Sequence, residues 1–182
     1  MSRTGKVQIA ILVFLTIWFL LTVIAPFTIP ANSVRNLTDV PGRIDNADVT
    51  KTMNPLAQAI YTTGDAYCNQ ISSHSYYLNG NQMPFCSRCE GIFLGLVVGM
   101  IIAIITGYEI TAIVLVLGIT PIAVDGLMQL LTRYVSINPI RVVTGLLAGI
   151  VVSLLISLFV RETLGDSKSP AGTKEDKPVR NC

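Results

Sequence analysis

The sequence predicts an all-α membrane protein with about four transmembrane helices and a polar loop of about 60 residues between the first and the second helix. Two observations support this fold class. Of the 182 residues, 51% are hydrophobic and only 13% are charged, whereas a soluble domain usually carries about 25% charged residues. The hydrophobic residues also gather in long runs, and the charged residues lie at the two ends of the chain and in one internal segment.

The first apolar run covers residues 7–25 and follows Arg3 and Lys6. It is long enough to cross a bilayer, exceeds the usual apolar core of a signal peptide, and is followed by no clear cleavage site, so we expect an uncleaved helix. Further spans are predicted at residues 91–108, 111–131 and 139–160. The predicted organisation is an N-terminal helix (1–26), a Cys/His-containing loop (27–90), a three-helix core (91–160) and a disordered tail (161–182).

Basic residues predict how the chain lies in the cell membrane. They flank the first span and follow the last one, and an even number of spans places both termini on the same side. The positive-inside rule makes that side the cytoplasm, so the loop 27–90 is expected to be extracytoplasmic. The net charge of +2 gives no electrostatic footprint for nucleic acid.

Local patterns predict some structure at both edges of this loop. Apolar residues at 56, 57, 60 and 61 indicate a short amphipathic helix that leads to Cys68. The pair Asn79-Gly80 indicates a turn. Small residues recur every fourth position in the second and fourth spans, a pattern that lets helix backbones approach closely in lipid; they are Gly91, Gly95, Gly99, Gly145, Gly149 and Ser153.

Three of the four cysteines and the only histidine lie between residues 68 and 89. Cys68, His74, Cys86 and Cys89 offer three thiols and one imidazole, which is the ligand set of a Cys₃His zinc site. We therefore expect these four residues to be metal ligands and zinc to be the candidate cofactor.

The same cysteines support two other interpretations. Cys86 and Cys89 form a C-x-x-C motif at the start of a predicted helix, with Arg88 between them, and both features favour a reactive thiolate. They are therefore redox candidates for a membrane thiol–disulfide oxidoreductase with a quinone or thiol partner. A plain structural disulfide with one spare cysteine is the third interpretation, and the sequence leaves all three open.

A second cluster consists of polar residues at membrane depth. Asp125, Gln129 and Arg133 share one helix face, and we expect Asp125 to pair with Arg141 across the short turn to the fourth span. Ionisable groups inside a membrane are costly and mark candidate sites. The predicted site lies in one layer with the cysteines and comprises Arg88, Glu90, Asp125, Gln129, Arg133, Asn138, Arg141 and Thr144.

Three arginines in this layer also favour an anionic-lipid interpretation, because guanidinium groups bind phosphate bidentately. A protein that binds an anionic lipid headgroup, or an enzyme that acts on lipid phosphate, would use Arg88, Arg133 and Arg141. Binding protein and enzyme therefore stay open alternatives.

Three short motifs, C-x-R-C, D-G-x-x-Q and N-x-x-R-x-x-T-G, occur at residues 86–89, 125–129 and 138–145. In this combination the chain resembles a family of small prokaryotic membrane proteins, domain of unknown function 2085. The resemblance implies a multi-helix membrane fold and the importance of these positions, and it implies no established activity. Members typically carry histidine directly after the first cysteine, where this chain has Asn69. The resemblance therefore supports the three cysteines more firmly than it supports His74.

Overall fold

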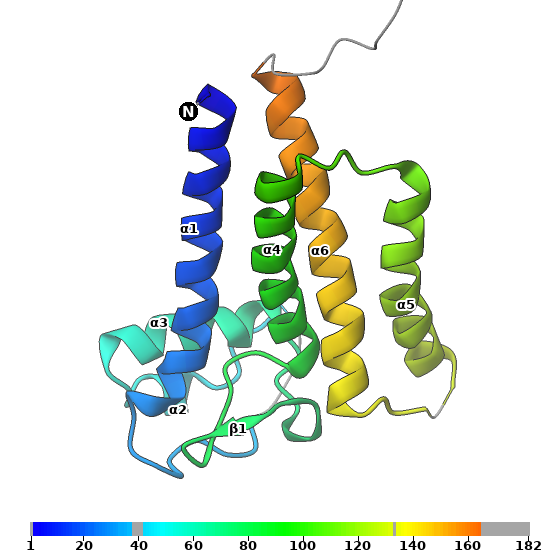
Figure 1. The fold of residues 1–182 in the computed structure, drawn as a ribbon. Coiled ribbons are helices and arrows are strands. Elements are labelled where there is room, and N and C mark those ends of the chain that lie inside the picture. The colour runs from blue at the N-terminus through cyan, green and yellow to red at the C-terminus, as the bar shows by residue number, and fades with distance from the viewer. Residues whose placement is uncertain (1, 38–41, 133, 165–182) are drawn as a thin grey trace, which may run out of the picture.

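Four long helices form the body of the protein, which is seen here as a computed structural model that describes residues 2–37, 42–132 and 134–164. They are α1 (Arg3–Ile24), α4 (Ser87–Thr106), α5 (Ala112–Leu131) and α6 (Asn138–Thr163). Within the described residues each is long and apolar enough to cross a membrane. The start of α1 and the end of α6 lie at one end of the bundle (Figure 1). The predicted four-span architecture agrees with this arrangement.

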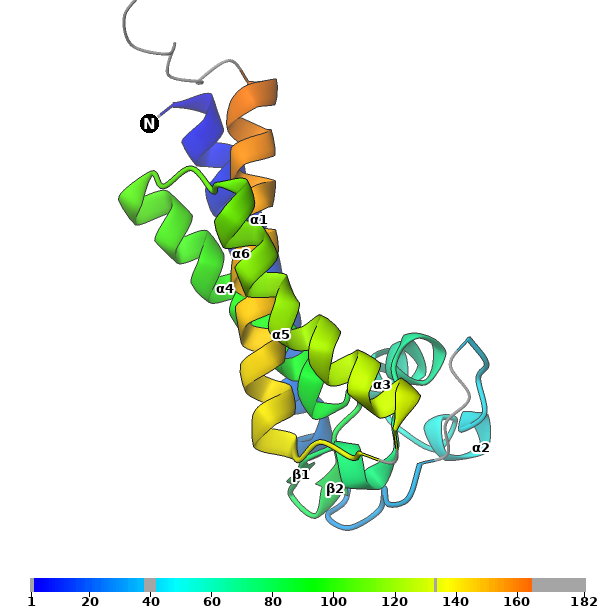
Figure 2. The same ribbon diagram turned by 90° about the vertical axis from the view of Figure 1, so that its right-hand side faces the viewer.

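The expected loop between the first two spans is a folded segment, which corrects the prediction. Residues 28–86, the connecting segment, contain α2 (Ala47–Thr50), α3 (Pro55–Tyr67) and the hairpin strands β1 (Tyr77–Leu78) and β2 (Asn81–Gln82). Short 3₁₀ turns lie at Ala25–Phe27 and Ser72–His74. Figure 2 shows this segment beside the end of the bundle opposite the N-terminus. The predicted amphipathic helix is α3, and the predicted turn joins β1 to β2.

Buried side-chain amides explain why a polar sequence folds here. Asn81 is fully buried; its Oδ1 accepts hydrogen bonds from the backbone amides of Ser33 and Val34 at 2.8 and 3.0 Å, and its Nδ2 donates to the Pro26 carbonyl at 2.9 Å. The Tyr61 hydroxyl donates to the Gln82 carbonyl at 2.6 Å. Such satisfied networks specify one arrangement of the backbone, and hydropathy alone does not reveal them.

The second span begins earlier than hydropathy predicts. α4 starts at Ser87, and the Glu90 amide already donates to the Cys86 carbonyl at 3.1 Å. The prediction placed the start at residue 91 because residues 87–90 are polar. Arg88, Cys89 and Glu90 therefore lie in the first helical turn, which fixes their directions relative to one another.

α4 and α6 touch backbone to backbone through the predicted small-residue ladders. A Cβ atom added at Gly91, Gly95 or Gly99 would lie 2.4, 2.3 or 2.6 Å from a carbonyl oxygen of α6. Added at Gly145 or Gly149, it would lie 2.3 Å from a carbonyl oxygen of α4. The glycines thus permit an approach that any larger residue would prevent.

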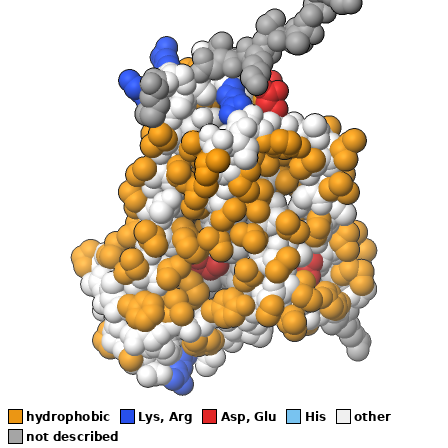
Figure 3. Space-filling view, viewed as in Figure 1, with side chains coloured by type: hydrophobic (Ala, Val, Ile, Leu, Met, Phe, Trp, Pro, Cys, Tyr) orange, Lys and Arg blue, Asp and Glu red, His pale blue; other side chains and the backbone are white. Residues whose placement is uncertain are grey.

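α5 is the least covered helix. Asp125 is its only buried residue in the part that the structure describes, and α5 packs along α6 on the side away from α1 (Figure 1). Figure 3 shows apolar side chains over the sides of the helices, with lysines and arginines near the end where α1 begins and also at the opposite end. This surface suits contact with lipid chains.

The glycine contact leads to a stability prediction. Gly95→Ala puts a methyl group 2.3 Å from the Leu146 carbonyl oxygen and 2.9 Å from the Gly149 Cα. Both are backbone atoms, so no side-chain rotation can relieve the clash. We expect the free energy of unfolding in detergent micelles to fall by about 1–3 kcal/mol. Gly126→Ala is the matched control, because an added Cβ meets nothing within 4 Å there. Equal stability of the two variants would contradict the close contact.

Candidate functional site

Three thiols meet where the connecting segment joins α4. Cys68 follows the end of α3, Cys86 precedes α4, and Cys89 lies in its first turn. Their Sγ atoms all lie within 4.8 Å of one another, with 3.3 Å between Cys68 and Cys89 and 3.5 Å between Cys86 and Cys89. We call these residues the thiol triad.

These distances distinguish a metal site from a formed disulfide. A disulfide needs about 2.05 Å between sulfurs, and all three cysteines are free thiols here. Sulfurs bound to one tetrahedral zinc ion at about 2.3 Å lie about 3.8 Å apart. The thiol triad is therefore close to one face of such a tetrahedron, and it is the one group of His, Cys, Asp or Glu in the described residues with metal-site spacing.

Apolar side chains cover one side of the triad. Cys68 and Cys86 are buried in a cluster that includes Trp18, Phe85 and Phe93. The three aromatic rings pack edge to face with centroid distances of 5.1 to 6.0 Å. Burial of this kind strengthens charge interactions among the sulfurs.

One thiolate is favoured within the unliganded triad. Hydrogen bonds from the Cys68 and Cys89 thiols lower the pKa of the Cys86 thiol, and the backbone amides of Cys89 and Arg88 act in the same direction, while burial opposes them. The same contacts, together with burial, raise the pKa of the Cys68 thiol. Of the three thiols, that of Cys86 is therefore the one whose deprotonated form its neighbours favour.

His74, the fourth predicted ligand, does not join this group. It ends the 3₁₀ turn Ser72–His74 and is partly buried. Burial lowers its pKa, and the positive charge of Arg141 adds to this effect. Its carbonyl oxygen accepts a hydrogen bond from the Ser87 hydroxyl at 2.8 Å, so the backbone of His74 supports the start of α4. The structure brings together the three thiols without its ring.

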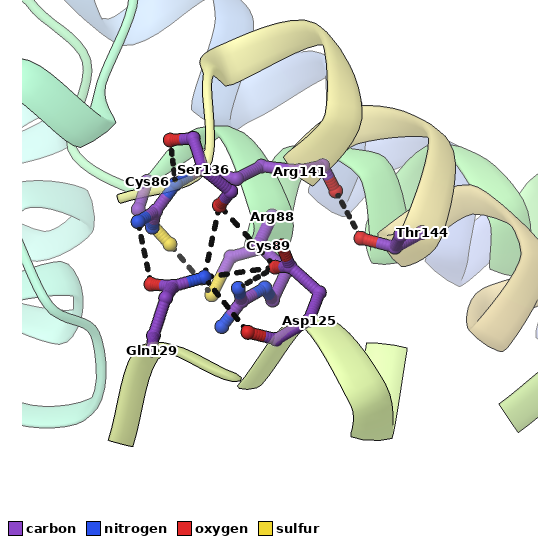
Figure 4. Close-up of polar contacts among 8 residues, drawn as sticks. All are labelled: Cys86, Arg88, Cys89, Asp125, Gln129, Ser136, Arg141 and Thr144. Carbon is purple, nitrogen blue, oxygen red and sulfur yellow. Dashed lines mark hydrogen bonds and ion pairs between the residues drawn. The ribbon is translucent and has the colours of Figure 1, made fainter. Parts of the chain in front are cut away.

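A connected set of polar side chains lies beside the triad (Figure 4). This polar network consists of Arg88, Asp125, Gln129, Ser136 and Arg141. Asp125 is buried and forms an ion pair with Arg88. Its Oδ2 also accepts hydrogen bonds from Gln129 Nε2 at 2.9 Å and from the Ser136 hydroxyl at 3.3 Å. The network joins α4, α5 and the start of α6.

The expected pairing of Asp125 with Arg141 is wrong. Arg141 donates instead to Gln129 Oε1 at 2.7 Å and to the Ser136 carbonyl at 3.0 Å. The reason is the early start of α4, which brings Arg88 to the carboxylate first. Ser136 was not among the predicted residues, and its only signal was a hydroxyl in the short connection between two spans.

The other predicted residues of this layer have different surroundings. Glu90 is 7% exposed and faces α1, where its Oε2 accepts a hydrogen bond from the Thr22 hydroxyl at 3.1 Å. Asn138 donates to the Ser75 carbonyl at 3.3 Å and so ties α6 to the connecting segment. The Thr144 hydroxyl donates to the Arg141 carbonyl within α6 at 3.2 Å. Arg133 lies outside the described residues, as does the predicted tail from residue 165 onward.

The network leads to a second stability prediction. Asp125→Ala removes the carboxylate that Arg88 pairs with. We expect the free energy of unfolding in micelles to fall by about 3 kcal/mol, because a buried charge loses its partner. The double variant Asp125→Ala/Arg88→Met should recover part of this loss, since it removes both members of the pair. A double variant less stable than Asp125→Ala would contradict the pairing.

Comparison with known proteins finds one matching family model and relatives in two archaea. The family model described as "Predicted membrane protein", domain of unknown function 2085, matches residues 68–155, a region that starts at the first triad cysteine. An uncharacterized protein of Methanocaldococcus jannaschii is 34% identical over 102 residues, which are 53% of this chain and 65% of that protein. An uncharacterized protein of Methanothermobacter thermautotrophicus is 33% identical over 91 residues, which are 48% of this chain and 82% of that protein.

The match thus spans just under two thirds of the first relative's length. No solved structure matches the chain. The matched region includes the thiol triad and the polar network together. The chain belongs to the family of predicted membrane proteins with domain of unknown function 2085.

Proposed function

We propose that this chain is a metal-binding membrane protein whose thiol triad holds one soft metal ion, with zinc as the ion that fits best. The single observation that carries the proposal is the convergence of three Sγ atoms within 4.8 Å of one another. Cys68 follows α3, whereas Cys86 and Cys89 lie at the start of α4, so the meeting of all three thiols is not a by-product of the C-x-x-C motif alone. Thiolates are preferred ligands of zinc and other soft cations.

The number of protein ligands decides what kind of metal site this is. A structural zinc site is closed by four protein ligands, whereas three protein ligands leave one position for water or an exchangeable ligand. His74 is not part of the triad's ligand group. The proposed site is therefore open at its fourth position and suited to handling a metal or a small ligand rather than only to stabilising the fold.

The metal would also connect two parts of the molecule. Cys68 belongs to the connecting segment, and Cys89 belongs to α4. An ion held by both links the segment to the membrane helices, and its binding free energy then contributes to the stability of the folded state.

A membrane thiol–disulfide oxidoreductase is the second candidate function. It is favoured by the position of Cys86 directly before α4 and by the contacts that lower the pKa of its thiol. In this reaction Cys86 and Cys89 would lose two protons and two electrons to a quinone or a disulfide partner and form one S–S bond. Their 3.5 Å separation fits such a pair in its reduced state.

The proposed orientation places the site outside the cytoplasm. Arg3 and Lys6 lie in the first turns of α1 and Arg161 lies in the last turn of α6, so these cations are at the end remote from the triad. Arg35, Arg43 and Lys51 lie in the connecting segment. They count less toward orientation, because the positive-inside rule applies chiefly to short loops.

Elemental analysis tests the proposed function. The full chain, purified in detergent from cells grown with zinc, is expected to contain about one zinc ion per chain. Cys68→Ser should lose at least nine tenths of that metal, because two thiols cannot hold the ion as tightly. Cys182→Ser is the matched control, since it makes the same change outside the triad, and it should keep the metal.

Two results would contradict the metal site. One is a wild-type protein without metal in which alkylation detects a Cys86–Cys89 disulfide that forms and breaks reversibly, as the oxidoreductase candidate requires. The other is equal metal content in Cys68→Ser and the wild type.

A further inference from the structure

The helix α3 exposes one side that carries no charge. Leu56 and Tyr67 are 41% and 83% exposed, and they lie about three helical turns apart on the same side of the helix. Ala59 and Thr63 lie between them on that side. The Thr63 hydroxyl donates to the Ala59 carbonyl at 2.8 Å, so it has a partner inside the helix. We call these four residues the α3 face.

The α3 face differs from the stretch of chain before it. The charged residue of α3 is Asp65, and it is buried at 3% exposure. A helix that faces water normally carries charged or polar side chains on its outer side. The described charged residues just before α3 are all exposed; they are Arg35, Arg43, Asp45, Asp48 and Lys51. The α3 face is therefore better suited to a less polar environment than water.

The start of α3 is tied to the end of the first membrane span. Asn54 caps α3, because its Oδ1 accepts a hydrogen bond from the Ala57 amide at 3.0 Å. Its Nδ2 donates at 2.8 Å to the carbonyl oxygen of Thr28, the residue that directly follows the span Arg3–Phe27. One amide side chain thus holds the first turn of α3, with Leu56, at the end of a span where Phe27 is 58% exposed.

The other end of α3 is tied to the start of the second span. Gly64 faces the Pro84 carbonyl oxygen, which would lie 1.9 Å from an added Cβ. Cys68, the next residue after α3, accepts a hydrogen bond at its Sγ from the Cys86 amide at 3.2 Å, and Cys86 directly precedes the span Ser87–Thr106. Figures 1 and 2 show α3 beside these two span ends. Both ends of α3 are therefore fixed at the edge of the membrane.

We propose that α3 is an interfacial helix and that the α3 face lies against the lipid of the bilayer that the four spans cross. The contact is with the glycerol and upper acyl region of the lipid, because the face offers no charge to a headgroup. Interfacial helices bury their apolar side about 5–10 Å into the boundary between headgroups and acyl chains. Tyr67 suits this boundary, since tyrosine places an apolar ring in lipid and keeps its hydroxyl in water.

This contact would set the depth of the thiol triad. Cys68 directly follows Tyr67 in the chain, so a lipid contact at Tyr67 holds the first triad cysteine at the level of the headgroups rather than in open water. The inference does not depend on a metal ion, because it rests on the two tethers of α3 and on its uncharged face.

Tryptophan fluorescence of the full chain in lipid nanodiscs tests the contact. Trp18 is the one tryptophan of the chain, so Trp18→Phe removes the background and Tyr67→Trp places a probe on the α3 face. Lipids brominated near the glycerol end of their acyl chains should quench about half of its emission. Quenching should be the same in zwitterionic and anionic lipid, since the face is uncharged.

Ile44→Trp in the same Trp18→Phe background is the matched control. Ile44 is also apolar and 54% exposed, but it lies between the exposed Arg43 and Asp45. The same lipids should quench at most about a tenth of the emission of this probe, because its charged neighbours keep it in water.

Several results would overturn the inference. An unquenched Tyr67→Trp probe would do so, and its emission wavelength would tell whether water or another protein, such as a second copy of the chain, covers the face. Equal quenching of both probes would remove the special position of α3, and quenching in anionic lipid alone would show a headgroup contact instead. If Trp18→Phe fails to fold, the wild type decides: a photolabel dissolved in the acyl region should modify Leu56 or Tyr67 and spare Ile44, and an unlabelled α3 would contradict the proposal.

Discussion

The rest of the structure depends on the contact between the backbones of α4 and α6. A Cβ atom at Gly145 would lie 2.3 Å from the Arg88 carbonyl oxygen, so the first turn of α4 rests directly on α6. This approach brings the turn that carries Arg88 and Cys89 against the turn that carries Arg141. A bulkier residue at the contact would separate the cysteine motif from its arginine neighbour. The glycine contact between α4 and α6 therefore also determines where the cysteine motif lies relative to Arg141.

The third thiol reaches the site by a different route. α3 ends at Tyr67, and its Gly64 faces the Pro84 carbonyl oxygen, which would lie 1.9 Å from an added Cβ. Gln70 donates to the same carbonyl at 2.7 Å. The chain on either side of Cys68 is thereby held against the stretch that leads into Cys86, whose amide donates to Cys68 Sγ at 3.2 Å. The triad is preorganised by backbone contacts, and preorganisation lowers the entropic cost of binding an ion.

The sequence predicted those elements that depend on neighbouring residues in the chain. The spans followed from apolar length, α3 from periodicity, and the hairpin from Asn79 and Gly80, which both adopt positive φ angles of 54° and 71° as a tight two-residue turn requires. Of the residues predicted to lie in one layer with the cysteines, Arg88, Asp125, Gln129 and Arg141 belong to one connected network, whereas Glu90 faces α1. The partner of Asp125 was wrong because spacing along one helix cannot show that Arg88 of another helix lies closer. Likewise, sequence distance could not tell that the ring of His74 stays out of the thiol group.

The central claim is that the triad binds one metal ion through three sulfurs. X-ray absorption at the zinc edge of the purified full chain measures this directly. The account predicts three sulfur neighbours at about 2.3 Å and one nitrogen or oxygen neighbour at about 2.0 Å. A first shell of oxygen and nitrogen atoms only would contradict it, because the zinc would then be bound away from the cysteines.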